Sequence, residues 1–541
     1  MSVHRVSASL LAGLLLAVSS SAHADDHLLT IGGGPSLNSN QISLENNVRY
    51  LQRALARMKL QGIDQKILFS DGGDPARDLQ YEAIYPADDA RLLLADIVGS
   101  MDGIRESYRS SSLPAVNGSA VPETIEKTVK DLSSELNQGD RLIVYFTGHG
   151  GPAKRDGQST FRMSFGNVEA NIGIGANSSS DSAEGGRARP SKFANNIMHL
   201  WNDNDLSVVE WTQKLDELSI DVPVVAIMVQ CYSGGFGNFV FAGGDPNNGL
   251  AKHPRCGFFS TVPDRVAAGC TPNVNEAEYR EYSSYFFEAL CGESRTGQTV
   301  TLPDYDHDGR TSLLEAHAYT VIHADTIDIP VRTSDIYLRQ VSKTKGKDGL
   351  LTSGSPIADL LAQAGPCETT VIEELSKEFQ LTGTDREKDV DEAIKAKRAE
   401  KQKFEANLRR HRQTVGNIKR DIAGTIRKRW PEVSNAWNPG ISKILAEDSD
   451  EIRKAIVEHD SYLELQLELE DIDKLAKESE SCDLQIVKLE RLKYWLESVA
   501  LAANLKTLEE AEKLDGLRRL VELESQFITP GNVVSTTSVD R

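Results

Sequence analysis

Short apolar runs alternate with amphipathic segments from about residue 25 to residue 365 of this chain. Apolar runs bounded by glycine, proline and polar residues are typical of buried strands, and a period near 3.6 residues is typical of helices. Strands that alternate with helices predict an α/β fold with a mostly parallel sheet flanked by helices. The predicted strands are residues 27–31, 66–70, 141–147, 222–229 and 257–261, and the predicted helices are residues 44–58, 122–136, 207–218, 279–290 and 312–324.

Two of the predicted strands end in reactive side chains. His149 follows strand 141–147 within Gly-His-Gly-Gly, and Cys231 follows strand 222–229 within Gln-Cys-Tyr-Ser-Gly-Gly. The carboxyl ends of neighbouring parallel strands share one edge of a sheet, and ligands bind there. If the two strands are neighbours, His149 and Cys231 face the same crevice.

A cysteine and a histidine at one sheet edge are suited to acyl transfer. The thiolate is the nucleophilic form of cysteine, and an imidazole can take up the thiol proton and later protonate a leaving amine. Flanking glycines let backbone amides approach a substrate carbonyl and donate to a developing oxyanion. Either motif alone is weak evidence, because Gly-His-Gly is often only a turn and a cysteine after a strand is often inert. Together the motifs predict a catalytic dyad.

The two motifs resemble those of the legumain family of cysteine peptidases. Tyr-Phe-Thr-Gly-His-Gly at residues 145–150 is similar to that family's histidine motif, and Cys-Tyr-Ser-Gly at residues 231–234 is similar to its nucleophile motif. Legumains belong to the larger clan of caspase-like peptidases, which also contains metacaspases and a transamidase subunit. The resemblance covers roughly residues 25–324 and implies a caspase-like peptidase domain, which is predicted to span residues 25–368.

The resemblance also implies roles for individual residues. Cys231 would be the nucleophile and His149 the general acid and base. The backbone amides of Gly150 and Cys231 would form the oxyanion hole. The substrate-binding S1 pocket would be lined by the segment that contains Ser260, Thr261 and Asp264.

Two features depart from the family pattern. Val229 stands where legumains carry Glu, caspases Gln and metacaspases Asp, and that position belongs to the surroundings of the S1 pocket. The step of 82 residues from His149 to Cys231 is longer than usual, because a predicted inserted loop occupies about residues 152–204. The resemblance therefore implies a reaction class without a cleavage specificity.

An acidic stretch at residues 304–315 matches the calcium-binding loop of an EF-hand. Carboxylates at its first, third and fifth positions supply oxygen ligands, a glycine follows at the sixth, and a glutamate closes the loop at the twelfth. No helix is predicted before the loop, so it leads into a single helix. The alternative is a solvated, Asp-rich turn without a metal. The predicted ligands are Asp304, Asp306, Asp308, the backbone carbonyl of Arg310, Ser312 through a water, and Glu315.

The N-terminus carries a short basic segment, a short apolar run and an Ala-His-Ala sequence that ends at Ala24. This pattern is typical of a secretory signal peptide, and the apolar run is too short to span a bilayer. Residues 1–24 are therefore predicted to be removed, which predicts a secreted or periplasmic protein. Such a compartment permits disulfides. Cys256 and Cys270, the pair closest in sequence, form the favoured bridge.

Charged helical sequence occupies residues 369–528, before a predicted flexible tail at residues 529–541. Apolar residues step by fours and threes from 404 to 426, which predicts a long amphipathic or coiled-coil helix. Residues 394–429 carry 13 Lys/Arg and 3 Asp/Glu, a net charge of +10, whereas residues 445–480 carry 4 and 13, a net charge of −9. The favoured interpretation is an antiparallel hairpin whose helices neutralise each other. An acidic partner or a membrane surface is the alternative.

The leading functional interpretation is an exported cysteine endopeptidase that cleaves proteins or peptides through a thioester of Cys231. A transpeptidase or transamidase would use the same dyad, and a catalytically silent caspase-like scaffold or a calcium-dependent assembly protein are further alternatives. The helical C-terminal region is expected to bind its own peptidase domain, as a legumain-type cap, or a partner protein. The net charge of −20 argues against a nucleic-acid binder, and no segment of the mature chain is predicted to span a membrane.

Overall fold

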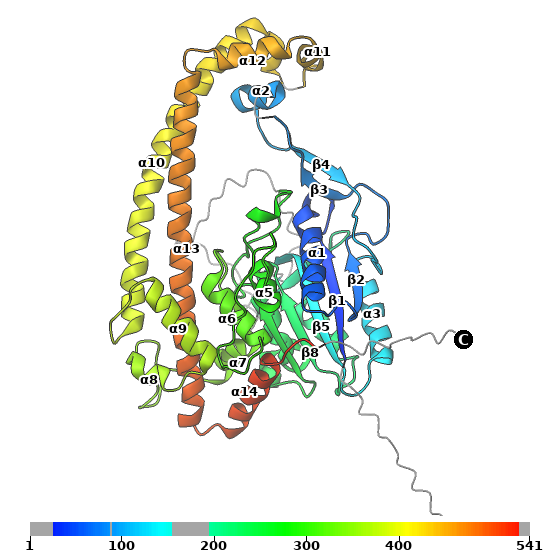
Figure 1. Cartoon of the computed structure of the whole chain (residues 1–541), viewed down its shortest axis with the longest axis vertical. Helices are drawn as coiled ribbons and strands as arrows, with labels where there is room; N and C mark the ends of the chain where they lie inside the picture. Colours follow the sequence, from blue (N-terminus) through cyan, green and yellow to red (C-terminus); the bar gives the residue numbers. More distant parts are fainter. Residues whose placement is uncertain (1–24, 87–88, 154–193, 436, 530–541) are drawn as a thin grey trace, which may run out of the picture.

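The computed structural model describes residues 25–86, 89–153, 194–435 and 437–529 (Figure 1). The predicted signal peptide, most of the predicted inserted loop and all but the first residue of the predicted tail lie outside the described residues. The described chain is an α/β protein in which a mostly parallel sheet lies between helices and a long helical hairpin runs alongside (Figure 1).

The predicted strands are confirmed, and they lie next to one another in one sheet. Its order is β10-β9-β8-β5-β1-β2, with parallel pairing except at the edge strand β10. Tyr145 in β5 is level with Thr30 in β1 and with Ile227 in β8, so the strand before His149 lies directly beside the strand before Cys231. The strands are β1 (Asp26–Gly33), β2 (Asp64–Phe69), β5 (Arg141–Gly151), β8 (Val224–Met228), β9 (Arg255–Phe259) and β10 (Val331–Arg332).

Helices cover both faces of this sheet. Successive side chains of a strand point to opposite faces, so Ile143 packs with α1, α5 and α6, whereas Val144 packs with α3, α4, α7 and α14. The predicted helices are confirmed, and Ser207 caps α4 through the predicted capping box with Glu210. The helices are α1 (Ile42–Arg57), α3 (Pro122–Glu135), α4 (Val208–Leu215), α5 (Tyr282–Cys291), α6 (Leu313–His323), α7 (Thr333–Val341) and α14 (Ala511–Glu524). Short 3-10 helices are η1 (Leu37–Ser39), η2 (Ser233–Val240), η3 (Ala242–Gly244), η4 (Pro246–Asn248), η5 (Glu276–Glu278) and η6 (Pro431–Ser434).

A β-hairpin occupies the last part of the predicted inserted loop. β6 (Ile197–Leu200) and β7 (Asn204–Ser207) pair antiparallel, and β6 also pairs with the end of β5. Asn202 and Asp203 both have positive φ at the turn, 63° and 55°, a conformation that Asn and Asp tolerate better than most residues. The prediction of a loop up to residue 204 is therefore wrong for its described end.

The C-terminal helices form the predicted antiparallel hairpin. α10 and α13 lie side by side, and α11 and α12 form its tip (Figure 1). Lys401 Nζ lies 2.7 Å from Asp483 Oδ2, and His411 Nδ1 lies 2.8 Å from Glu468 Oε2. The two contacts join side chains of the basic and the acidic helix, as the self-neutralising interpretation expects. The helices of this region are α8 (Ile357–Leu361), α9 (Pro366–Glu378), α10 (Arg386–Arg429), α11 (Gly440–Glu447), α12 (Ser449–Val457) and α13 (Tyr462–Thr507).

An arm formed by β3, α2 and β4 extends from the body of the molecule to the tip of the hairpin. β3 (Leu79–Glu82) and β4 (Glu106–Arg109) form a two-stranded antiparallel ribbon, and α2 (Ala90–Val98) lies between them in the sequence. α2 packs against α10 and α12 (Figure 1). The arm therefore bridges the α/β region and the far end of the hairpin.

The end of the chain belongs to the main core. Leu505 of α13 and Leu520 of α14 are buried in the cluster that covers one face of the sheet. Beyond α14, the backbone N–H of Thr529 donates at 2.7 Å to Oδ2 of Asp26, the first residue of β1. Residue 368 is therefore not the end of an independently packed core. Within the described ranges, no helix has the length and apolar character that a bilayer crossing requires.

Candidate functional site

His149 and Cys231 lie at neighbouring strand ends, at the carboxyl edge of the sheet. The backbone N–H of Val229 donates to the carbonyl of Phe146 at 3.1 Å, which extends the pairing of β5 and β8 up to this edge. Gly150 lies directly against the nucleophile's peptide, because a Cβ atom at Gly150 would sit 2.3 Å from the carbonyl oxygen of Cys231. Only glycine permits this approach of the two chain segments.

The imidazole of His149 is oriented by the segment before α1. Its Nε2 lies 2.8 Å from the carbonyl oxygen of Ser39 and 3.0 Å from Gln41 Oε1. A carbonyl oxygen only accepts, so Nε2 carries the hydrogen and Nδ1 is the basic nitrogen of the neutral ring. Burial lowers the pKa of His149 to about 4, and the nearby imidazole of His199 acts in the same direction.

The thiol of Cys231 is held by a loop that follows β9. The backbone N–H of Ala267 donates to Cys231 Sγ at 3.3 Å, and the carbonyl oxygen of Ala267 lies 3.8 Å from the same sulfur. Burial raises the pKa of the Cys231 thiol above its usual value, and the carboxylate of Asp328 adds to this shift. Because the pKa of His149 is lowered, thiol and imidazole are both neutral near pH 7.

The backbone around Cys231 turns sharply and leaves a donor available. Tyr232 adopts the left-handed conformation, with φ of 60°, which is uncommon for a residue with a side chain. Among the described residues, no carbonyl accepts a hydrogen bond from the backbone N–H of Cys231. That N–H is suited to the predicted oxyanion hole, and Gly150, its predicted partner there, lies against the same peptide.

A row of polar side chains that the sequence did not predict extends from His149. His149 is level with His199 in β6, which is level with Asp205 in β7. Residues at one level of an antiparallel ribbon share a face. His199 Nδ1 lies 2.5 Å from Asp205 Oδ1, so this second histidine is oriented by a carboxylate. Asn196 joins the same ribbon to the nucleophile loop by donating to the carbonyl of Tyr232 at 2.8 Å.

The residues expected to line S1 are not equally accessible. Ser260 and Thr261 are fully buried, and the hydroxyl of Ser260 lies 3.0 Å from that of Ser233. In this conformation their side chains face the interior. Asp264 is exposed.

The expected disulfide between Cys256 and Cys270 is wrong, because both cysteines are free thiols. Cys256 lies near the start of β9, level with Val225, at the amino ends of the strands. Cys270 Sγ lies 3.6 Å from the carbonyl oxygen of Gly148, at the carboxyl edge. The length of β9 separates the two thiols, although few residues separate them in the sequence.

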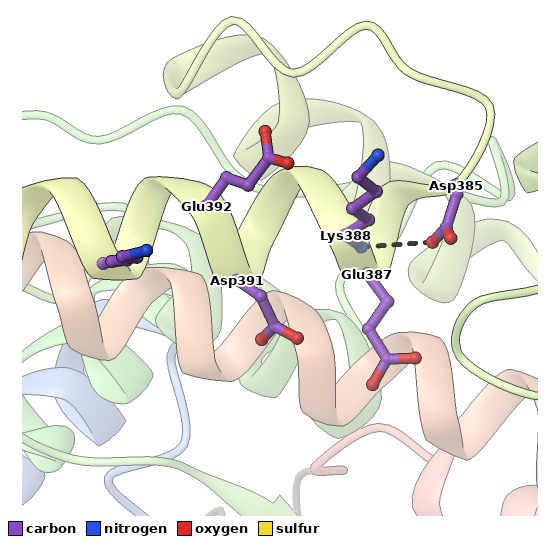
Figure 2. A pocket seen from close by; sticks show the side chains of 6 residues that line it. Asp385, Glu387, Lys388, Asp391 and Glu392 are labelled. Atoms are coloured by element: carbon purple, nitrogen blue, oxygen red, sulfur yellow. Dashed lines mark hydrogen bonds between the residues drawn. The ribbon is translucent and has the colours of Figure 1, made fainter.

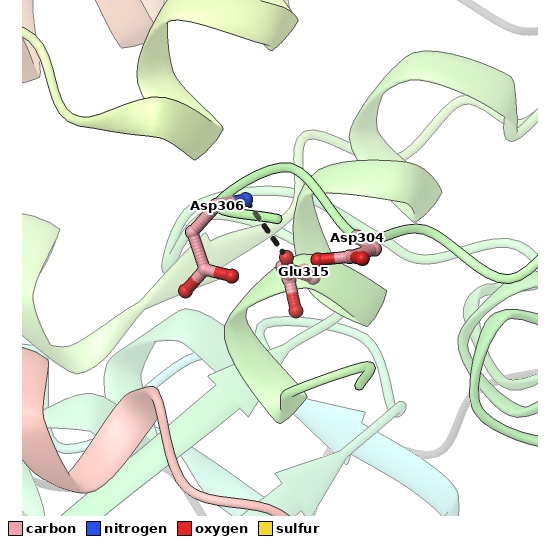
Figure 3. A group of neighbouring side chains, drawn as sticks. All are labelled: Asp304, Asp306 and Glu315. Carbon is pink, nitrogen blue, oxygen red and sulfur yellow. Dashed lines mark hydrogen bonds between the residues drawn. The ribbon is translucent and has the colours of Figure 1, made fainter. Parts of the chain in front are cut away.

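The acidic loop before α6 gathers part of the predicted ligand set. Asp304, Asp306 and Glu315 each place a carboxylate oxygen within 4.8 Å of the others (Figure 3). Glu315 Oε1 accepts from the backbone N–H of Tyr305 at 2.6 Å, which fixes the carboxylate facing the loop. Gly309 has φ of 85°, as the sharp turn at this position requires.

The donor set fits a hard cation. Asp304 Oδ1 is buried and has no hydrogen-bond partner among the described residues, and every candidate ligand atom in the cluster is an oxygen. The side chains of the other predicted ligands, Asp308 and Ser312, make other contacts. Asp308 is exposed and accepts from the backbone N–H of Arg310 at 2.9 Å, and Ser312 caps α6 in a capping box with Glu315.

A shallow surface depression lies at the start of α10, far along the chain from the dyad. Its lining consists of charged side chains, Asp385, Glu387, Lys388, Asp391, Glu392 and Lys395 (Figure 2). Lys493 of α13 pairs with Glu387 at 3.1 Å and with Asp391 at 2.8 Å. The depression is therefore an open, charged seam beside two helices and not an enclosed pocket.

No family model matches the chain, and no curated protein is similar enough to it in sequence to count as a relative. The chemistry of the site is therefore inferred from its own residues.

Proposed function

We propose that the chain is a cysteine peptidase of the legumain and caspase-like kind, with Cys231 as its nucleophile and His149 as its acid and base. The observation that carries the proposal is the adjacency of the two strand ends, where Gly150 packs on the Cys231 peptide. The orientation of His149 by the Ser39 carbonyl adds support, because it leaves Nδ1 as the base.

The reaction begins from a neutral pair. His149 Nδ1 accepts the thiol proton as Cys231 Sγ attacks the carbonyl carbon of the scissile bond, and the backbone N–H of Cys231 donates to the oxyanion. The C–N bond breaks as the imidazolium returns its proton to the leaving amine, which leaves a thioester on Cys231. Water, deprotonated by His149, then attacks the thioester and releases the acid and the free thiol.

The test is a peptide library incubated with the full chain and with variants. Cys231→Ala and His149→Gln should each lower cleavage by at least about a thousandfold, because the two groups act as one unit. Cys291→Ala is the matched control, since this partly buried thiol lies in α5, outside the dyad. Cleavage that survives Cys231→Ala would refute the proposal, and a chain without any activity would favour the silent scaffold.

The protonation states give a second test. Alkylation of Cys231 by iodoacetamide should be slow at pH 7 and should accelerate only above the usual thiol range, because burial raises the thiol pKa. A thiolate–imidazolium pair would instead react at a nearly constant rate from acid pH upward. That flat profile would contradict the neutral resting pair and leave the reaction class intact.

A transpeptidase would share the thioester and differ only in the acceptor. In the same library assay, an added amine such as glycine amide competes with water for the acyl group. Exclusive hydrolysis in its presence would support the peptidase, whereas amide products would support transamidation.

We further propose that the acidic loop binds calcium as a structural ion. Support comes from the all-oxygen cluster and the unpartnered oxygen of Asp304. Extracellular sites of this type often have Kd near 10⁻⁴–10⁻³ M, so about 10 mM calcium should stabilise the fold by about 1–3 kcal/mol. Asp304→Asn should abolish the rise in melting temperature, and Asp348→Asn, on an exposed turn, should retain it. An equal rise in all three proteins, or none in the wild type, would contradict the site.

A further inference from the structure

The backbone of residues 265–268 covers one side of the Cys231 thiol. The carbonyl of Arg265 accepts from the backbone N–H of Tyr232 at 2.8 Å, and Ala267 presents both its N–H and its carbonyl oxygen to Cys231 Sγ. Reacting atoms must come within about 3–3.5 Å of each other. A substrate carbonyl therefore cannot approach the sulfur from this side while residues 265–268 stay in place.

Helix α13 holds this segment through an ion pair. Arg265 Nη1 lies 3.0 Å from Glu490 Oε2, and both side chains are largely covered, with 19% and 22% exposure. Glu490 also lies 3.5 Å from Arg398 of α10, so the same carboxylate contacts both helices of the hairpin. The position of Arg265 consequently depends on how α10 and α13 sit together.

Helix α13 supports the segment a second time through a buried loop. The backbone N–H of Ala268 donates to Asp328 Oδ1 at 2.7 Å. The loop that carries Asp328 is gathered by Arg491, which is fully buried and donates to the carbonyl oxygens of Val321, Ala324, Thr326 and Asp328 at 2.7–3.0 Å. An arginine that donates to so many carbonyls fixes the backbone that it binds.

We propose that α13 regulates the reactivity of Cys231, because Glu490 and Arg491 hold residues 265–268 against the thiol, and release of this segment opens the covered side of the sulfur to substrate. The inference rests on the proposed peptidase function and adds to it the element that controls the site. Glu490 and Arg491 are positioning residues, since neither touches the thiol. A change in the packing of α10 on α13 is the event that releases the segment.

The test measures thiol access directly. Alkylation of Cys231 by iodoacetamide is followed by peptide mass spectrometry in Arg265→Ala, Glu490→Ala, the double variant and Lys493→Ala. The first two should each accelerate alkylation about two- to fivefold, the range that the loss of a partly exposed ion pair supports. The double variant should be no faster than the faster single variant, because both changes break the same contact. Lys493→Ala removes another α13 ion pair, to Glu387 and Asp391, and should leave the rate unchanged.

The remaining cysteines and the cleavage assay separate the outcomes. Alkylation of Cys291, in α5, should stay constant, and equal acceleration at Cys291 and Cys231 would overturn the proposal, since it indicates general loosening. Unchanged rates at Cys231, or multiplicative effects in the double variant, would also overturn it. Faster alkylation in a chain that cleaves no peptide would support control of the thiol while the peptidase proposal fails. Cleavage that depends on Cys231 and ignores both variants would do the reverse.

Discussion

The root and the tip of the α10–α13 hairpin are attached to the rest of the molecule in different ways. At the root, α13 packs with α6 and α9 around Leu492 and Trp495. Its Arg491 donates to the carbonyl of Asp328, in the loop that supports residues 265–268. At the tip, the hairpin packs against the arm helix α2, through a separate apolar cluster that contains Leu94 and Ile422 (Figure 1).

The difference indicates that the root and the tip of the hairpin have different roles. The root belongs to the core that supports the nucleophile, so it cannot leave without unfolding the α/β region. The tip is held by a small contact that can open while the core stays folded, because stability is not uniform across a structure. The hairpin reaches the surroundings of Cys231 through Arg265, which pairs with Glu490, and through the loop of Asp328, which Arg491 binds.

The largest expected effect comes from matched cavities made at the root and at the tip of the hairpin. Leu492 at the root and Ile422 at the tip are each fully buried. Leu492→Ala should lower the free energy of global unfolding by about 2–5 kcal/mol, because it leaves a cavity in the core. Ile422→Ala removes similar packing but should chiefly speed hydrogen exchange in residues 90–98, with a smaller loss of global stability. Denaturant unfolding and hydrogen exchange measure the two effects, and equal global losses would show that root and tip form one cooperative unit.

The α/β architecture follows from local patterns in the sequence. Runs such as residues 142–146 and 222–229 are apolar throughout, as expected for strands covered on both faces, and Ser207 with Glu210 marks a helix start. These signals are local, so they are visible without the fold. The bounds of β5 differ from the prediction because the strand continues through the glycines to pair with β6.

The surroundings of the dyad depend on contacts that no local pattern reveals. Ala267 touches the thiol, yet it is an alanine in an unpatterned loop. Arg491 is one of many charged residues in a helical stretch, and only the fold shows that it is buried. His199 and Asp205 were detectable in principle, because Asn202 and Asp203 mark a hairpin turn that brings the two together.

A smaller expected effect is the pH dependence of the unfolding free energy that Asp328 contributes at the root. Burial raises the pKa of Asp328 to about 7, above its usual value of 3.8. A carboxyl group with a raised pKa in the folded state contributes stability below pH 4 that is lost as the pH rises through 7. Asp328→Asn does not titrate and keeps an oxygen that can accept from Ala268, so its stability should not fall over this range. The difference in unfolding free energy between wild type and variant should change by at least about 1 kcal/mol between pH 4 and pH 8.

Asp348→Asn, on an exposed turn, is the control for that experiment and should follow the wild type. A parallel pH profile for Asp328→Asn would show that the Asp328 carboxyl is not desolvated at the root.

The smallest expected effect concerns the ion pair between α10 and α2 at the tip. Lys419 Nζ of α10 lies 2.5 Å from Asp96 Oδ1 of α2, and both side chains are partly exposed. Lys419→Ala should therefore cost only about 0.2–1 kcal/mol, and it should appear as faster exchange in residues 90–98 rather than as a lower global midpoint. Lys127→Ala is the control, because it breaks an exposed ion pair with Asp131 that lies within α3 and joins no two regions. If Lys419→Ala also accelerates alkylation of Cys231, the tip is coupled to the root along α10 and α13. If the rate is unchanged, the arm stabilises the hairpin without reaching the thiol.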